Sequence, residues 1–221
     1  MVQKNIDIIP IRYMSGTGGQ FLSSFITAAK TKNNQAIRLS LFGNAHTNNL
    51  LDFSLPGHPA FGPDRPDSLK IDATLNLIGN EGSVPIYYSA MHFMDIKLLL
   101  TTFDRVISIT YDIDDVSDIA LIFYGKFYID ELQSNTDISN HRYVTMKITL
   151  KYSSRFFKEY ESDNVLNVSW KELFHLDTNI LVEKISAFTS IPKENFNISN
   201  LLEWRKVTSQ CLDKVSSTLN T

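Results

Sequence analysis

The sequence contains very little cysteine and no long apolar run. Cys211 is the only cysteine in 221 residues, so an internal disulfide is excluded and a reducing compartment is indicated. No apolar run approaches the roughly 20 residues that a membrane-spanning helix needs. Residues 1–5 lead directly into a strand-like segment, without the apolar core of a signal peptide. We therefore expect a cytoplasmic protein with no membrane partner.

An excess of charge of either sign is also lacking. The chain has 21 Lys and Arg against 24 Asp and Glu, which gives a formal net charge of −3. Nonspecific binding to nucleic acid or anionic lipid depends on a strongly basic surface, because contacts to phosphate dominate that affinity. The composition therefore predicts no nucleic-acid partner.

Linkers, internal repeats and low-complexity tracts are absent from the sequence. The 221 residues are 43% hydrophobic, and a chain of this length can bury roughly 70% of the surface of its unfolded state. We expect one domain over residues 1–221. Residues 43–83, which are rich in Asn, Gly, Pro and His up to about residue 67, are predicted to form a long loop or lid insertion.

Strand-like and helix-like segments alternate along the chain. Strands are predicted at 6–13, 36–42, 85–90, 105–111 and 165–170, from short apolar or β-branched runs. Helices are predicted at 20–30, 92–102, 114–132, 138–160, 178–189 and 199–217, with Pro192 as a breaker. Such alternation implies right-handed crossovers and a central parallel sheet. The expected fold class is a three-layer α/β/α domain.

A glycine-rich turn, Ser15–Gly19, separates the first strand from the first helix. Its glycines permit positive φ angles and a close approach of the main chain to a ligand. The helix start behind it favours an anion, so the turn predicts a phosphate or sulfate site. The simpler interpretation is a turn that only reverses the chain. The turn has no lysine for a standard triphosphate loop and no G-x-G-x-x-G dinucleotide pattern.

Four segments of the chain resemble the sulfotransferase family, in the same order. Residues 13–17 (Tyr-Met-Ser-Gly-Thr) are similar to its opening loop, and residues 88–93 and 105–116 to its central strands. Residues 164–192 are similar to its late strand–helix segment. The resemblance covers about two-thirds of the chain and is strongest to divergent members carried by bacterial viruses. For such a member the compartment is the host cytoplasm.

The resemblance implies a P-loop-like fold that binds 3′-phosphoadenosine 5′-phosphosulfate, the sulfuryl donor. His92 corresponds to the general base, which removes a proton from a hydroxyl or amine of a small-molecule or glycan acceptor. The donor-binding positions carried over from the family are Ser15, Gly16, Thr17, Gly18, Gly19, Gln20 and Ser117. No metal is expected.

Two basic residues of the family pattern are replaced. Met14 stands where the family has its loop lysine, and Tyr111 where it has an arginine for the 3′-phosphate. Each loss removes a charge-assisted hydrogen bond of roughly 1.5–3 kcal/mol. Either other cations replace them, or the chain does not use this donor. The candidate replacements are Arg12, Arg105, Lys126, Arg205 and Lys206.

Other interpretations of the same residues stay open. His92 could cap or pack a helix rather than catalyse. The acidic group Asp112, Asp114, Asp115 and Asp118 could bind a metal, although N-cap and first-turn positions of the 114–132 helix explain it better. Asp112 after an apolar strand also suggests a nucleotide-dependent kinase. A further alternative is a non-catalytic binding or virion-associated protein with the same fold.

Overall fold

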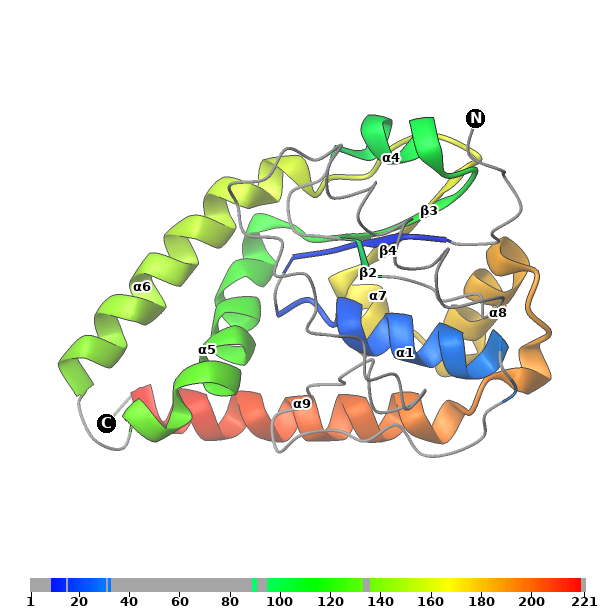
Figure 1. Ribbon diagram of the computed structural model, residues 1–221. Helices are drawn as coiled ribbons and strands as arrows, with labels where there is room; N and C mark the ends of the chain where they lie inside the picture. Colours follow the sequence, from blue (N-terminus) through cyan, green and yellow to red (C-terminus); the bar gives the residue numbers. More distant parts are fainter. Residues whose placement is uncertain are drawn as a thin grey trace, which may run out of the picture.

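The chain folds around a parallel β-sheet that has helices on both faces. The computed structural model describes residues 9–14, 16–30, 32, 89–90, 95–132 and 136–219. In Figure 1, α4 (Ile96–Thr102) lies above the sheet, and α1 (Gly19–Lys30) lies below it with α9 (Ile198–Leu219) beyond. The predicted α/β class with a parallel sheet is confirmed, and the arrangement is compatible with three layers.

The four strands in the described part of the chain pair in parallel in the order β2-β1-β3-β4. They are β1 (Ile11–Arg12), β2 (Ser89–Ala90), β3 (Val106–Thr110) and β4 (Val165–Ser169). β3 pairs with β4 along its whole length and is buried at every position. The β-branched run at 105–111 predicted this buried strand correctly, because both faces of a parallel sheet are covered.

The helices agree with most of the predicted segments. The others are α5 (Val116–Leu132), α6 (Thr136–Ser153), α7 (Trp170–His175) and α8 (Thr178–Thr189). Three short 3-10 turns lie at Ile113–Asp115, Ser154–Phe156 and Lys193–Asn195. The predictions for 20–30, 178–189 and 199–217 are confirmed, and that for 92–102 is confirmed from Ile96 onward.

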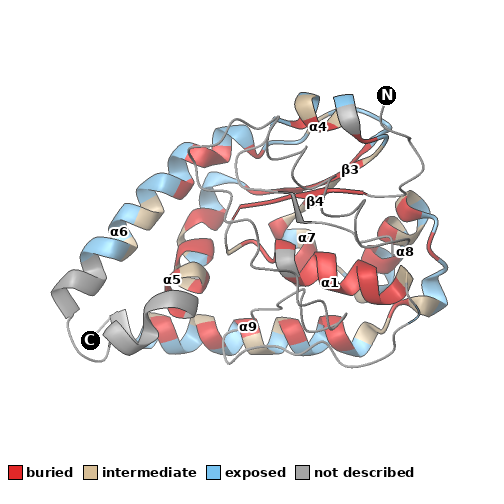
Figure 2. Cartoon of the chain, viewed as in Figure 1, coloured by how far each residue is buried: buried red, intermediate tan, exposed pale blue. Residues whose placement is uncertain are grey.

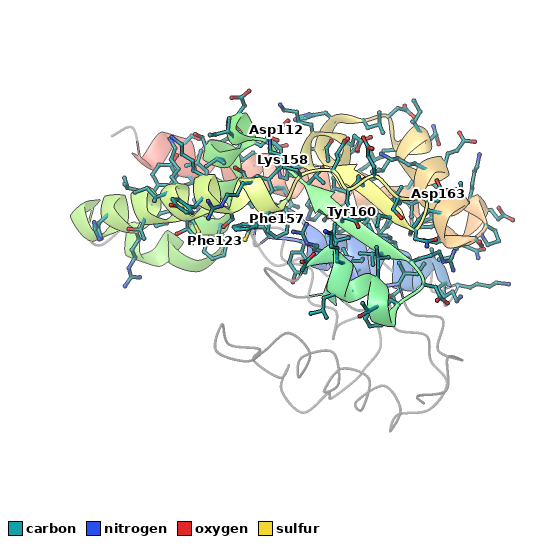
Figure 3. The ribbon with its side chains drawn as sticks, turned by 90° about the horizontal axis from the view of Figure 1, so that it is seen from above. Asp112, Phe123, Phe157, Lys158, Tyr160 and Asp163 are labelled. Atoms are coloured by element: carbon teal, nitrogen blue, oxygen red, sulfur yellow. The ribbon has the colours of Figure 1, made fainter. Side chains whose placement is uncertain are left out.

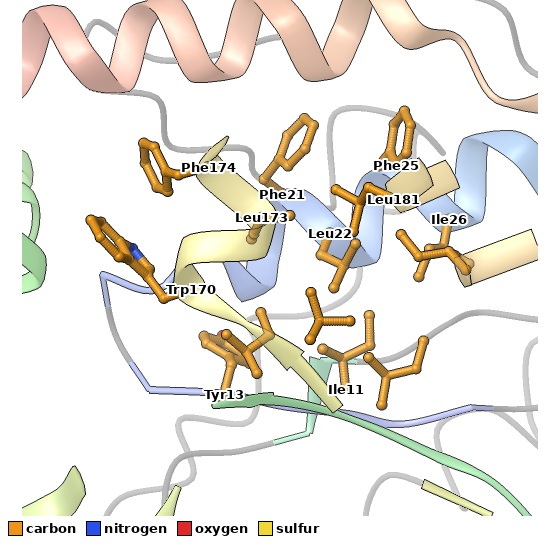
Figure 4. Close-up of a cluster of buried hydrophobic side chains, with 14 of the residues drawn as sticks. Ile11, Tyr13, Phe21, Leu22, Phe25, Ile26, Trp170, Leu173, Phe174 and Leu181 are labelled. Carbon is orange, nitrogen blue, oxygen red and sulfur yellow. The ribbon is translucent and has the colours of Figure 1, made fainter. Parts of the chain in front are cut away.

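The main core lies between the sheet and α1, α7 and α9. In Figure 4, Leu22 and Ile26 point from α1 toward the strands, whereas Phe21 and Phe25 point toward α9. The Phe21 ring stacks on Trp204, with centroids 4.5 Å apart. α1 is buried along almost its whole length (Figure 2), so both its sheet-facing and its α9-facing sides hold the core together.

A second, smaller core lies between the sheet and α4 and contains Ile96, Leu99, Phe103, Val106 and Val165. α4 begins at an N-cap, Asp95, whose carboxylate accepts a hydrogen bond from the Lys97 amide at 2.9 Å. This capping satisfies an amide that has no partner inside the helix.

The prediction of one helix over 138–160 is wrong at its end. α6 stops at Ser153, and the following 3-10 turn leads to Phe157, which is fully buried beside Tyr111 with ring centroids 5.6 Å apart. Figure 3 shows Phe157, Lys158 and Tyr160 along the segment that then runs to β4. A continuing helix would carry Phe157 away from this contact, so tertiary packing ends α6 early.

The strand predicted at 165–170 is one residue too long, because Trp170 is the first residue of α7. The Ser169 hydroxyl accepts from the Glu172 amide, and the Glu172 carboxylate accepts from the Ser169 amide. Ser-x-x-Glu is the sequence pattern of such a capping box, and it was visible at 169–172.

Several predictions lie outside the described residues. They are the strand at 36–42, the loop or lid at 43–83, the first part of the strand at 6–13 and the strand at 85–90 before Ser89. None of the helices in the described ranges combines the length and the apolar character that crossing a bilayer would require.

Gly125 is a point of close contact between α5 and α9. A Cβ atom at this position would lie 2.6 Å from Val215 Cγ2 and 2.8 Å from Cys211 Sγ. We predict that Gly125→Ala lowers the free energy of unfolding by about 1–3 kcal/mol, because overpacking outweighs the gain in helix propensity. Urea denaturation of Gly125→Ala, Val215→Ala and the double variant measures the coupling. Strictly additive effects would contradict the contact.

Candidate functional site

The carboxyl ends of the four described strands meet at one edge of the sheet. In the order β2-β1-β3-β4, the chain crosses over β1 between β2 and β3. Along the described chain, β1 is followed by β2 on one side of it, whereas β3 is followed by β4 on the other side. Open parallel sheets bind ligands outside the carboxyl ends at such a point. The turn after β1 and the segment after β3 flank it.

The turn after β1 is a tight, internally bonded loop. Gly16 and Gly18 have φ angles of 89° and 86°, which side chains with a Cβ rarely adopt. The Thr17 amide and hydroxyl both donate to the Met14 carbonyl, at 3.1 and 2.6 Å. These bonds stabilise the turn itself, and Thr17 is completely buried.

The start of α1 presents main-chain donors at the end of this turn. The first α-helical bond runs from the Leu22 amide to the Gly18 carbonyl at 2.9 Å. The amides of Gly19, Gln20 and Phe21 therefore have no acceptor within the helix. The first turn of α1 contains no acidic residue. A helix start with such amides and no nearby carboxylate is of the kind whose dipole favours an anion.

Close packing also requires the glycines of the turn. A Cβ at Gly18 would lie 2.7 Å from the Trp204 ring and 2.9 Å from Leu173, and one at Gly19 would lie 2.0 Å from the Tyr13 ring. The turn is therefore held between α7 and α9. Packing therefore requires a glycine at both positions, and at Gly18 the positive φ requires it as well.

The capped start of α7 positions Leu173 against the turn. Burial alone would raise the pKa of Glu172, but its hydrogen bonds with Lys184 and Ser169 bring that pKa below the ordinary value of 4.5. The Lys184 ammonium lies 2.7 Å from the carboxylate. The charged form of Glu172 thus stabilises the helix that supports the turn.

Met14 and Tyr111, which replace the family's basic residues, are both core residues. They are 5% and 3% exposed, so neither side chain is free to approach a bound anion. The Tyr111 hydroxyl donates to the Leu150 carbonyl at 3.2 Å, and burial raises the pKa of this phenol. The two positions therefore contribute packing where the family pattern has positive charge.

Arg12 is the candidate replacement cation nearest the turn in sequence, and it is 3% exposed. Its guanidinium donates to Ser108 Oγ at 3.2 Å and to the Phe156 carbonyl, and lies 4.2 Å from the centre of the Phe157 ring. Burial lowers the pKa of Arg12 to about 10, so it stays charged at neutral pH. These contacts tie the guanidinium to β3 and to the segment after α6.

Two other candidate cations also donate to main-chain carbonyls. Arg105 lies before the amino end of β3 and donates to the Phe188 carbonyl at 2.6 Å, so it belongs to the opposite edge of the sheet. Arg205 donates to the Leu173 carbonyl at 2.9 Å, and burial lowers its pKa. Both guanidinium groups thus join neighbouring elements.

Lys171 is a cation at the carboxyl edge that sequence reasoning missed. It is 56% exposed, and its ammonium lies 3.2 Å from Asp115. The hydrogen bond with this buried carboxylate raises the pKa of Lys171. Of the remaining candidates, Lys206 pairs with Glu203 at 3.7 Å, and the side chain of Lys126 lies outside the described residues.

The predicted site residues are only partly brought together. Gly16, Gly18 and Gly19 form the turn with Thr17. Burial raises the pKa of Tyr143 on α6, and Ser117 lies close enough to that phenol to offset part of the rise. Gly16 instead meets α5 at Ile119, which is rotated about 200° around the helix from Ser117. Ser15, His92 and the side chain of Gln20 lie outside the described residues.

In the acidic group after β3, Asp112 and Asp115 are hydrogen-bonded to each other at the start of a helical segment. The Asp112 amide donates to the Asp115 carboxylate at 2.9 Å, and the Asp115 amide donates to the Asp112 carbonyl at 3.2 Å. This confirms a helix-start role for the pair. Among the described residues, no three His, Cys, Asp or Glu side chains are grouped as metal ligands.

We predict that Glu172→Gln lowers the free energy of unfolding by about 1 kcal/mol at about pH 7. Because the folded-state pKa of Glu172 is depressed, its contribution is present above the ordinary carboxylate pKa. It is lost as the pH falls through the folded-state value. Urea denaturation at neutral pH and below about pH 4 measures the difference.

The control is Glu183→Gln, which removes an exposed partner of Lys193. It should cost less than about 0.5 kcal/mol. An equal effect of both variants at all pH values would argue against the capping role of Glu172.

Comparisons with known proteins do not assign a family to the chain. No protein-family model, no curated protein and no solved structure matches it. The candidate site therefore depends on the geometry of the turn after β1 and on its place at the carboxyl edge of the sheet.

Proposed function

We propose that the chain is a sulfotransferase-like P-loop protein that binds 3′-phosphoadenosine 5′-phosphosulfate through the turn at 15–20. The observation that carries this proposal is the turn itself, with two positive-φ glycines and an acid-free helix start at the switch point of a parallel sheet. Such a cradle favours a phosphate or sulfate group. The four segments similar to sulfotransferases indicate which anion it would be.

In the proposed reaction, an oxygen or nitrogen of the acceptor attacks the donor sulfur. The bond between sulfur and the bridging phosphate oxygen breaks, and 3′-phosphoadenosine 5′-phosphate leaves with the bonding electron pair. His92, two residues along the chain from the end of β2, takes the acceptor proton. The amides of residues 19–21 are the donors available for the developing negative charge.

A non-catalytic binding protein is the second candidate. Met14 and Tyr111 are buried in the core, and the described contacts of Arg12 and Arg105 are with hydroxyl, carbonyl and ring groups of the protein. A multiply charged donor would therefore meet fewer cations than in the family pattern. Such a site still suits a single phosphate or sulfate group, held by main-chain amides.

We predict that 3′-phosphoadenosine 5′-phosphate binds with micromolar affinity or better in titration calorimetry. Gly18→Ala should weaken it at least about tenfold, because the turn needs a positive φ at this position. Gly125→Ala is the matched control, since it also crowds a helix contact but lies outside the turn. No heat at millimolar ligand would refute donor binding, and magnesium-dependent binding of a nucleoside triphosphate instead would favour the kinase.

We predict that His92→Ala reduces sulfuryl transfer by about 10²–10⁴-fold while binding of 3′-phosphoadenosine 5′-phosphate stays unchanged. Transfer from radiolabelled donor to a panel of hydroxyl and amine acceptors measures the rate. Full turnover in the variant would remove His92 from the mechanism. Donor binding without any turnover in the unsubstituted protein would support the non-catalytic candidate.

A further inference from the structure

α6 has apolar side chains on two opposite sides. Its inner side packs on the protein through the half-buried Tyr143 and Met146 and the fully buried Leu150. The outer side carries a second row, which we call the outer row: Val144, Ile148, Tyr152 and, in the following turn, Phe156. They are 50%, 59%, 65% and 54% exposed. In Figure 1, α6 lies on the outside of α5.

The outer row accounts for most of the large apolar exposure of the described chain. Besides its four members, only Ile113, Ile180 and Leu202 among the described residues are large, apolar and more than half exposed. Those three lie on different elements. A continuous row of this kind marks an interaction surface, whereas scattered apolar residues do not.

The shape of the outer row suits one neighbouring helix. Residues four apart in an α-helix are rotated by about 40°, so Val144, Ile148 and Tyr152 span an arc of about 80° over roughly 12 Å. This places one large apolar side chain on each turn, which is the ridge that packs into the groove of another helix. Helices that lie on a bilayer have wider apolar faces.

On one side of the outer row, the neighbouring polar residues are threonines whose hydroxyl groups are already hydrogen-bonded. The Thr145 hydroxyl donates to the His141 carbonyl at 2.9 Å, and the Thr149 hydroxyl donates to the Thr145 carbonyl at 3.0 Å. Both hydroxyls are thus satisfied inside α6. A partner could cover these threonines without having to supply acceptors for them.

Every Asp, Glu, Lys or Arg in the segment that carries the outer row, residues 138–158, is a Lys or Arg, although the whole chain is mildly acidic. Residues 138–158 contain no Asp or Glu. Their cationic residues are Arg142, Lys147, Lys151, Arg155 and Lys158. The Arg155 guanidinium lies over the Tyr152 and Phe156 rings, 4.5 and 4.7 Å from their centres. Positive charge is therefore interleaved with the apolar row.

We infer that the outer row of α6 is a docking site for an acidic amphipathic helix of another protein. Such a helix would place one apolar side chain per turn against the outer row and its Asp and Glu side chains against the flanking cations. A second copy of this chain is disfavoured, because two copies of the same basic segment would face each other. The inference is independent of the function proposed for the turn.

The test uses the full-length protein and two synthetic helical peptides. Both peptides have the same row of leucines, one on each helical turn. One peptide has Glu at the flanking positions and the other has Lys. Fluorescence anisotropy should show at least about tenfold tighter binding of the Glu peptide, with an affinity that falls as salt is raised. Equal binding of the two peptides, or no binding of the Glu peptide at about 100 µM, would overturn the inference.

Variants locate the binding surface. Ile148→Ser should weaken binding of the Glu peptide about tenfold, the cost of losing one buried isoleucine. Ile180→Ser is the matched control, because this isoleucine is 54% exposed on α8, outside the outer row. The double variant Lys147→Glu, Lys151→Glu should shift the preference toward the Lys peptide. Equal losses from the two serine variants would contradict docking on α6.

Two further measurements distinguish other occupants. Vesicles of phosphatidylserine and phosphatidylcholine should bind the protein more weakly than the Glu peptide does. Tighter, Ile148-dependent vesicle binding would assign the surface to a membrane instead. Sedimentation that showed a dimer abolished by Ile148→Ser would assign it to a second copy of the chain.

Discussion

The packing of Trp204 against the turn after β1 is the contact on which the rest of the structure depends. Its indole stacks on Phe21 with the ring planes only 7° apart, lies 4.8 Å from Phe174, and fills the space that a Cβ at Gly18 would need. One side chain therefore joins α9, α1, α7 and the turn. Because protein interiors are close-packed, this contact allows the turn few alternative shapes.

The roles of the buried cations explain how the carboxyl edge differs from a standard phosphate loop. The described cations near the fold's centre hold elements together: Arg12 joins β1 to the end of α6, and Arg205 joins α9 to α7. Burying such groups is costly unless they are hydrogen-bonded, and here their donors meet carbonyl and hydroxyl oxygens. At this edge the start of α1 contributes main-chain amides that have no acceptor within the helix.

The two sides of α6 have different roles. Its inner residues contribute to the main core, whereas the side chains of its outer row are at least half exposed. The net charge of −3 gave no indication of this surface, because charges elsewhere cancel it. Only the placement of α6 outside α5 separates the two apolar rows into one that is buried and one that faces solvent (Figure 2).

The sequence alone determined the element types and the turn. Helical spacing identified α1, α8 and α9, the β-branched run identified β3, and the glycines marked the turn, because these signals are local. Tertiary structure decided what depends on distant partners. The burial of Phe157 ended α6 early, and the strand order placed the turn beside β3. It also directed Arg12 toward Phe156, because burial and hydrogen-bond partners are set by residues far apart in the chain.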